Sequence, residues 1–156
     1  MNTTRYILLI FSFILVIGAC SNDDEGDSVD EIALASGNYA LIELNINPPQ
    51  DINNDGNTTS NVLTELPCVT GNLNLRSDGN WIWTLTETSV TSITGGAFYL
   101  SCTSDITTRS GSWTISGNQV TLYDGASNFN FTKDADQLTI IEGDDLPGFD
   151  SMVFER

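Results

Sequence analysis

The chain has 156 residues, of which 21 are acidic and 5 are basic, and its sequence contains no histidine. This length suits one domain rather than two. The net charge of −16 argues against nucleic acid as a partner, because nucleic-acid binding begins with a basic surface. The lack of histidine removes the commonest general base, the Ser-His and Cys-His nucleophile pairs and most zinc sites. A composition that is 40% hydrophobic and 17% charged predicts a folded domain.

The first twenty residues have the pattern of an export signal. Arg5 precedes an apolar run over residues 6–16, which is shorter than the about 20 residues that span a bilayer. Small residues then lead to Cys20. This order resembles the lipobox of bacterial lipoproteins, in which the signal peptide is cut before a cysteine that receives a diacylglycerol. The resemblance implies a signal peptide over residues 1–19 and a membrane anchor, with fatty acyl chains such as palmitate, at Cys20; the alternative is an ordinary secretory signal with a chance cysteine.

Residues 20–35 begin with an acidic segment that is almost free of apolar side chains. Such a composition predicts a solvated, flexible tether. The segment resembles the acidic tract that directs lipoproteins of the Bacteroidetes group to the cell surface. It therefore implies an outer-membrane lipoprotein exposed at the cell surface, and a protein that faces the periplasm is the alternative.

The rest of the chain is predicted to form short strands. Alternating apolar residues recur in about nine runs that end at Gly, Asn or Asp, and only residues 61–66 look helical. In the first run, the face expected to point inward carries Ala40, Ile42, Leu44 and Ile46. The predicted strands cover residues 39–46, 72–76, 81–88, 97–102, 110–115, 119–123, 127–132, 137–141 and 151–155.

Short turns between these runs favour pairing of neighbouring strands. Asp78-Gly79, for example, is a typical hairpin turn because it tolerates positive φ angles. Closure into a barrel removes the exposed edges that such a meander otherwise leaves. The sequence therefore predicts an all-β fold, an antiparallel up-and-down barrel of about eight strands with one short helix.

Three segments carry a resemblance to a family. Residues 111–122, G-S-W-T-I-S-G-N-Q-V-T-L, resemble the hairpin of the lipocalin-like domains found in many Bacteroidetes lipoproteins. Residues 51–68 are similar to the Asp/Asn-Gly stretch, short helix and cysteine of those domains, and residues 73–83 to their second hairpin. The resemblance implies a small calyx-like barrel over residues 36–156. It implies no particular ligand, and Gly37-Asn38-Tyr39 departs from the Gly-x-Trp with which many members begin.

Two further cysteines, Cys68 and Cys102, remain after the lipobox. In a secreted chain, a single pair of this kind is most often joined. We therefore expect a Cys68–Cys102 disulfide, with two free buried thiols as the alternative.

Large apolar side chains dominate the predicted inward face of the barrel. An eight-stranded barrel is just wide enough to be filled by side chains or to hold one small ligand. The sequence therefore predicts a non-catalytic lipoprotein that binds a small apolar or amphipathic molecule. The alternative is a structural or protein-interaction surface module with a filled barrel. The candidate ligand contacts are Trp81, Trp83, Trp113, Phe129 and Phe131.

A possible metal loop lies after the first predicted strand. Asp51, Asn53 and Asp55 alternate before Gly56, as in the first half of a calcium loop, and Asn57 could add its carbonyl oxygen. The second half of the pattern fails, because Val62 occupies the position of the bidentate glutamate and Glu65 comes three residues late. A turn without metal is the alternative.

No catalytic residue is expected. Most of the remaining acids fall in predicted turns, and no nucleophile elbow, phosphate loop or dinucleotide motif is present in the sequence. No cofactor is expected apart from the candidate structural calcium.

Overall fold

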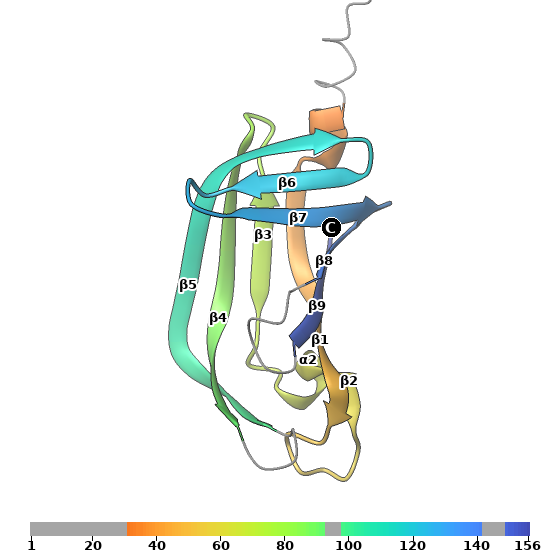
Figure 1. Cartoon of the computed structure of the whole chain (residues 1–156), viewed down its shortest axis with the longest axis vertical. Coiled ribbons are helices and arrows are strands. Elements are labelled where there is room, and N and C mark those ends of the chain that lie inside the picture. The colour runs from red at the N-terminus through yellow and green to blue at the C-terminus, as the bar shows by residue number, and fades with distance from the viewer. Residues whose placement is uncertain (1–30, 93–97, 142–148) are drawn as a thin grey trace, which may run out of the picture.

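A computed structural model describes residues 31–92, 98–141 and 149–156 of the chain. The predicted signal peptide, residues 1–19, and the predicted lipidation site Cys20 lie outside the described residues. The described part is an antiparallel β-barrel, as the sequence predicts (Figure 1). Eight strands close it, because β1 pairs with β3 along one edge and with β9 along the other, and the short β2 extends the β3 edge.

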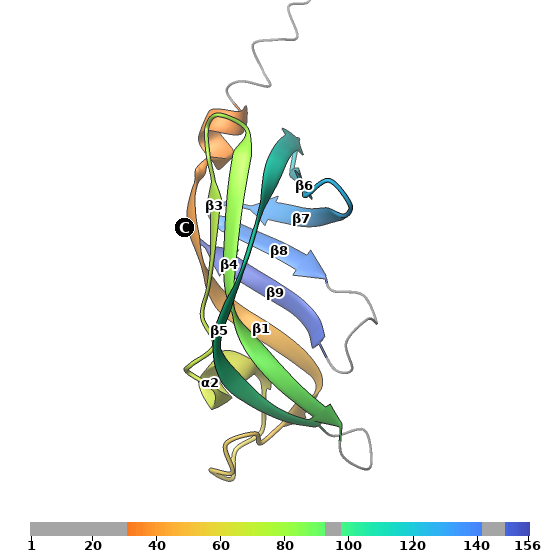
Figure 2. The same cartoon turned by 90° about the vertical axis from the view of Figure 1, so that its left-hand side faces the viewer.

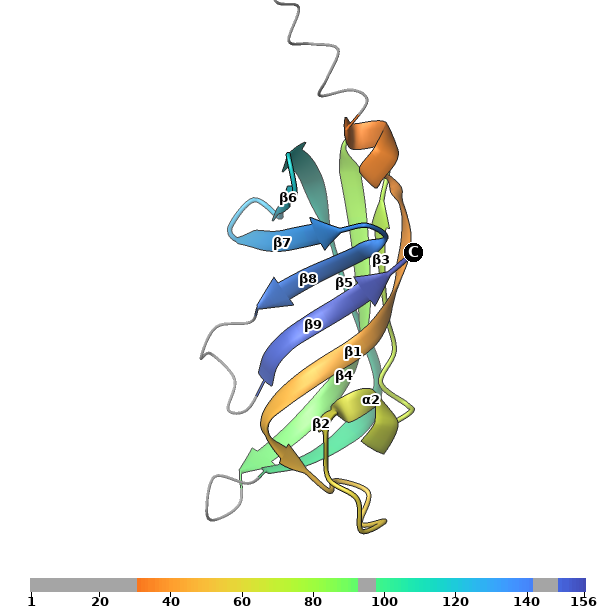
Figure 3. The same cartoon turned by 90° about the vertical axis from the view of Figure 1, so that its right-hand side faces the viewer.

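The strands follow each other around the barrel in chain order, which makes it an up-and-down meander. Their bounds are β1 (Gly37–Gln50), β2 (Thr59–Asn61), β3 (Gly71–Leu75), β4 (Asn80–Ser92), β5 (Phe98–Ser116), β6 (Gln119–Tyr123), β7 (Asn128–Asp134), β8 (Gln137–Ile141) and β9 (Phe149–Glu155). One short helix, α2 (Val62–Glu65), follows β2. Strands β6 to β9 and β1 form one wall (Figure 3), and β3 to β5 form the other (Figure 2).

The hairpin turns follow from residues that accept left-handed backbone angles. Gly79, between β3 and β4, has φ of 79°, and Gly117, between β5 and β6, has φ of 60°. Asp78 also accepts the backbone N–H of Asn80 at 3.0 Å. Both turns lie where the sequence predicts them, because the required φ values favour glycine.

The inward face of β1 differs from the prediction. Tyr39 and Leu41 are buried in the first half of β1, whereas Ala40 is exposed. The register between β1 and β9 shifts between Leu41 and Glu43. A β-bulge of this kind adds one residue and reverses the alternation. The predicted inward set was therefore wrong for Ala40 and Ile42, and Leu44 and Ile46, beyond the bulge, are buried as expected.

The strand β5 replaces two predicted strands. Residues 97–102 and 110–115 were expected as separate strands, but β5 runs without interruption over 19 residues. It pairs with β4 from Ser92↔Phe98 to Asn80↔Ser112. The pairing has one irregularity, where Glu87 alone faces the residues between Cys102 and Ile106. Only the end of β5 pairs with β6, from Ser112↔Tyr123 to Ser116↔Gln119.

The segment around α2 occupies the space beside the second half of β1, where the short β3 does not reach. Asn61 caps α2, because its Oδ1 accepts the backbone N–H of Leu63 at 3.0 Å. The same oxygen accepts the N–H of Leu44 on β1 at 3.2 Å. The predicted disulfide is present, and it joins Cys68, which follows α2, to Cys102 on β5.

The N-terminal end of the described chain is fixed to the barrel. Residues 31–35 are helical, although they were expected as the end of the tether. The guanidinium of Arg156 donates to the carbonyl oxygens of Leu34 and Ser36 at 2.9 and 3.1 Å. The Tyr39 hydroxyl donates to the carbonyl of Ala35, which is fully buried. These contacts hold the helical segment against the barrel.

Gly111 allows β5 to approach β6 closely, and its replacement gives a first testable prediction. A Cβ atom at this position would overlap with the carbonyl oxygen of Tyr123. Because that neighbour is backbone, Gly111→Ala is expected to lower the free energy of unfolding by about 1–3 kcal/mol, as overpacking does elsewhere. Urea unfolding would measure the effect, with Ser110→Ala as the exposed neighbouring control. Equal stability of the two variants would contradict the prediction.

Candidate functional site

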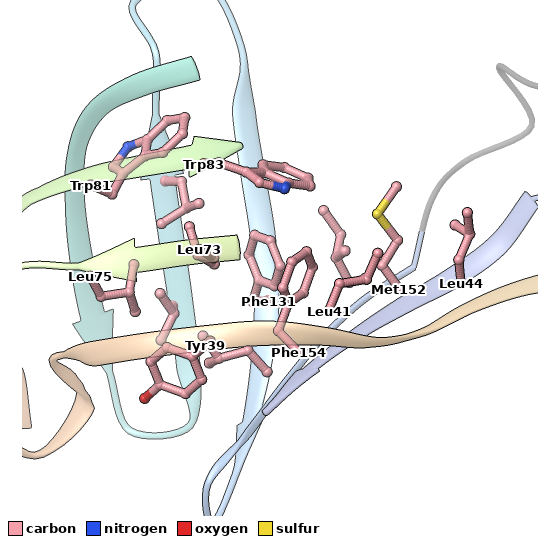
Figure 4. Close-up of a cluster of buried hydrophobic side chains, with 14 of the residues drawn as sticks. Tyr39, Leu41, Leu44, Leu73, Leu75, Trp81, Trp83, Phe131, Met152 and Phe154 are labelled. Atoms are coloured by element: carbon pink, nitrogen blue, oxygen red, sulfur yellow. The ribbon is translucent and has the colours of Figure 1, made fainter. Parts of the chain in front are cut away.

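The barrel interior holds a cluster of aromatic rings (Figure 4). Trp83 extends from β4 toward Phe131 and Phe154, whose ring centroids lie 5.8 and 5.6 Å from its own. Phe129 meets Trp83 at 5.7 Å and Trp81 at 6.3 Å. All of these pairs are edge-to-face, which is a favourable arrangement of aromatic quadrupoles. The two walls of the barrel are thus joined by aromatic packing.

Most of the candidate ligand contacts are buried within this core. Trp81, Trp113 and Phe131 have at most 2% of their surface exposed, and Trp83 has 6%. Only Phe129 is partly exposed. The structure therefore brings all five candidates together in one packed interior.

The three tryptophan N–H groups have different surroundings. Trp81 Nε1 donates to the carbonyl of Ser112 at 2.9 Å, and Trp113 Nε1 donates to the carbonyl of Arg76 at 3.0 Å. Trp83 Nε1 is buried and has no hydrogen-bond partner among the residues that the structure describes. Its ring lies among those of Phe129, Phe131 and Phe154.

One side of the interior is bordered by a charged group. Arg109 lies opposite Trp83 in the β4–β5 register, and its guanidinium is 4.4 Å from the centroid of Phe129. The same guanidinium forms an ion pair with Asp124. Hydrogen bonds from the backbone N–H of Ser127 and of Ala126, together with Arg109, lower the pKa of Asp124. No sequence motif indicates this contact, because Arg109 and Asp124 meet only through the β5–β6 pairing.

The acidic loop between β1 and β2 lies at the opposite end of the barrel from residues 31–35 (Figure 1). Carboxylate oxygens of Asp51, Asp55 and Glu65 lie within 4.8 Å of one another. Glu65 is only 5% exposed, and its Oε2 accepts the backbone N–H groups of Ile52 and Asn53 at 3.3 Å. Glu65 comes three residues after the position of the glutamate in the calcium-loop pattern. The chain folds back at α2, and this brings the Glu65 carboxylate to the loop.

Hydrogen bonds within the loop organise its remaining oxygens. Asp51 accepts the N–H groups of Asp55 and Gly56 at 3.1 and 2.9 Å. The side-chain amides of Asn53 and Asn57 donate to Asp55 at 3.3 and 3.0 Å. The backbone N–H of Asn57, with smaller contributions from these amides, lowers the pKa of Asp55. The loop therefore gathers all four predicted residues, with Asp55 as an ionised carboxylate at neutral pH.

Within the described part of the chain, no ion pair neutralises the charge of this loop. The three ion pairs of the described ranges are Arg76–Asp78, Arg109–Asp124 and Arg156–Asp136. Hard oxygen ligands without a neighbouring cation suit calcium, but exposed acids in turns are also common without a metal. Calcium binding by this loop stays a prediction.

A calcium titration tests that prediction. With calcium at about 100 times its dissociation constant, a single site would stabilise the folded chain by about 2.7 kcal/mol. We expect a rise in melting temperature that Glu65→Gln reduces, because the amide keeps the shape of the side chain but loses its charge. Asp105→Asn, an exposed acid outside the loop, is the control. An unchanged melting temperature in the parent chain would contradict the prediction.

A shallow groove of about 250 Å³ is also present on the β3–β4–β5 wall. Its lining contains no titratable side chain, so it offers no general acid or base. The lining residues are Thr70, Gly71, Asn72, Thr84, Leu85, Thr86 and Ile106.

Comparisons with known proteins gave no relative. No family model matches the chain, and no curated protein or solved structure matches it. Within the described residues, no helix is long and apolar enough to cross a membrane.

Proposed function

We propose that the chain is a membrane-anchored, non-catalytic lipoprotein of lipocalin-like type. Its lipid-bearing residue would be Cys20, and its barrel would act as a structural or protein-interaction module on the cell surface. The observation that carries this choice is the burial of the aromatic interior. Trp81, Phe131 and Phe154 are at most 1% exposed, which leaves little of their surface for a ligand.

Hydrogen bonding in the interior supports the same choice. Trp81 and Trp113 use their N–H groups to hold backbone carbonyls of neighbouring strands. The third donor, Trp83 Nε1, has no hydrogen-bond partner among the described residues, but it is buried and the side chain is only 6% exposed. The filled barrel thus supports a structural or protein-interaction module. The sequence alone favours the other interpretation, a barrel that binds a small ligand.

A small apolar ligand remains a second candidate because of one observation. Phe129 and Leu85 are only partly buried, although they pack against the core. A ligand that reached these two side chains would contact one side of the interior without displacing the aromatic cluster.

Native mass spectrometry of the full chain, purified in detergent from a lipidating bacterium, tests the proposal. We expect the mass of a lipid at Cys20 and no further organic molecule. An additional organic mass that is lost on denaturation would overturn the filled barrel in favour of the container. The Cys20→Ala variant is the matched control, and a lipid mass that persisted in it would contradict the anchor.

A further inference from the structure

The strand β5 has a long edge with which no described strand pairs. Its edge toward β6 is paired only from Ser112 onward, whereas its pairing with β4 begins at Phe98. In Figure 1, β6 crosses only the upper end of β5. Unpaired N–H and C=O groups along a strand edge are a template for another strand.

The composition of this edge does little to prevent such pairing. Residues 98–110 contain no lysine and no proline, the residues that usually protect strand edges. Ile106, Thr107 and Thr108 are β-branched and favour extended backbone. Ile106 is also 66% exposed. A second strand beside it would cover part of this apolar surface.

The usable part of the edge is short and has defined limits. On one side, Gly111 already lies against the Tyr123 carbonyl. On the other side, β4 and β5 lose regular register between Cys102 and Ile106. The regular free edge therefore covers residues 106–110, and a partner strand must be centred there.

The charges of β5 select one register for a second copy of this strand. In an antiparallel pair related by a twofold axis at Thr107, Asp105 of each copy, the residue directly before the regular edge, comes opposite Arg109 of the other. Twofold registers centred elsewhere on residues 106–110 do not place these two charges opposite each other. Oppositely charged cross-strand pairs stabilise a sheet, and like charges destabilise it.

Both charged residues have the capacity for this contact. Asp105 forms no ion pair among the described residues. Arg109 already pairs with Asp124, but its guanidinium carries five N–H donors and can serve a second carboxylate. In the same register, Ile106 lies opposite Thr108 of the other copy.

We propose that two copies of the chain associate through antiparallel pairing of their β5 edges, with the twofold axis at Thr107. The interface is isologous, so it closes as a dimer and leaves no further β5 edge. A contact of this length is smaller than a standard stable interface, so the dimer is weak and forms at high local concentration. The proposal does not depend on the lipid anchor or on the content of the barrel.

Cysteine trapping in the full chain tests the register. In Thr107→Cys, the two introduced thiols face each other across the axis, and we expect an intermolecular disulfide under mild oxidation. Directly opposed residues in antiparallel strands have Cα atoms about 4.5–5.5 Å apart, within the range that a disulfide bridges. Physiological ionic strength, with a Debye length of about 8 Å, limits repulsion between the two acidic chains.

Two matched controls make the result decisive. Thr114→Cys is also exposed on β5 but lies in its β6-paired part, and the parent chain controls for Cys20. Cross-linking at Thr107 that is at least tenfold above both controls is expected. Equal cross-linking of the two variants, or none at Thr107, would overturn the proposal. Asp105→Lys in the Thr107→Cys background should lower the yield several-fold, and an unchanged yield would exclude this register.

Discussion

Replacing Trp83 with alanine is expected to lower the free energy of unfolding by about 3–5 kcal/mol, the usual cost of removing a buried tryptophan. The side chain is 6% exposed and contacts the rings of Phe129, Phe131 and Phe154. Its loss would leave a cavity between the two walls of the barrel. Urea unfolding followed by circular dichroism would measure the change without relying on tryptophan emission.

Ile82→Ala is the control for Trp83, because Ile82 is adjacent on β4 but 40% exposed. A much smaller loss, below about 1 kcal/mol, is expected there. If Trp83→Ala were no more destabilising than Ile82→Ala, the filled core would be contradicted. Trp83→Phe adds a second comparison: it keeps an aromatic ring but removes the unpartnered N–H, so it should cost far less than alanine.

Removing the Cys68–Cys102 disulfide should lower the free energy of unfolding by a similar amount. The bridge closes a loop with a sequence separation of 34 residues. In the chain-entropy account, a loop of this length is worth about 4 kcal/mol, because the cross-link restricts the unfolded chain. The double variant Cys68→Ser and Cys102→Ser, compared with the parent chain in a chemical unfolding titration, measures this loss.

The parent chain treated with reductant is the companion measurement. It should lose about the same stability as the double serine variant, because both remove the same cross-link. A stability loss below about 1 kcal/mol in both samples would show that the α2 segment holds its place through packing alone.

Local signals in the sequence predict much of this fold. The turns at Gly79 and Gly117 and the alternation along β6 to β9 depend on neighbouring residues, so they can be read from short windows. The disulfide follows from a pair of cysteines in a chain whose N-terminus resembles an export signal. The closed order of strands follows because short turns favour neighbours and closure protects the edges.

Features that depend on distant contacts were not predictable. The bulge after Leu41 arises in the pairing of β1 with β9, more than a hundred residues later, so alternation alone gave the wrong face for Ala40. The continuity of β5 comes from its long pairing with β4, which overrides its polar middle. Glu65 joins the acidic loop only because α2 folds back, and sequence spacing places it too late.

The closure of the barrel has a consequence for the order of folding. Each hairpin from β3 to β9 forms from residues close in sequence, whereas β1 and β9 meet only when nearly the whole described domain is present. Closing that long loop costs entropy before it gives any contact, so nascent chains should assemble an open sheet first and join its ends last. Until it closes, the open sheet would expose β1 and β9 as two unpaired edges, and rapid completion of β9 would be the step that protects the chain from aggregation.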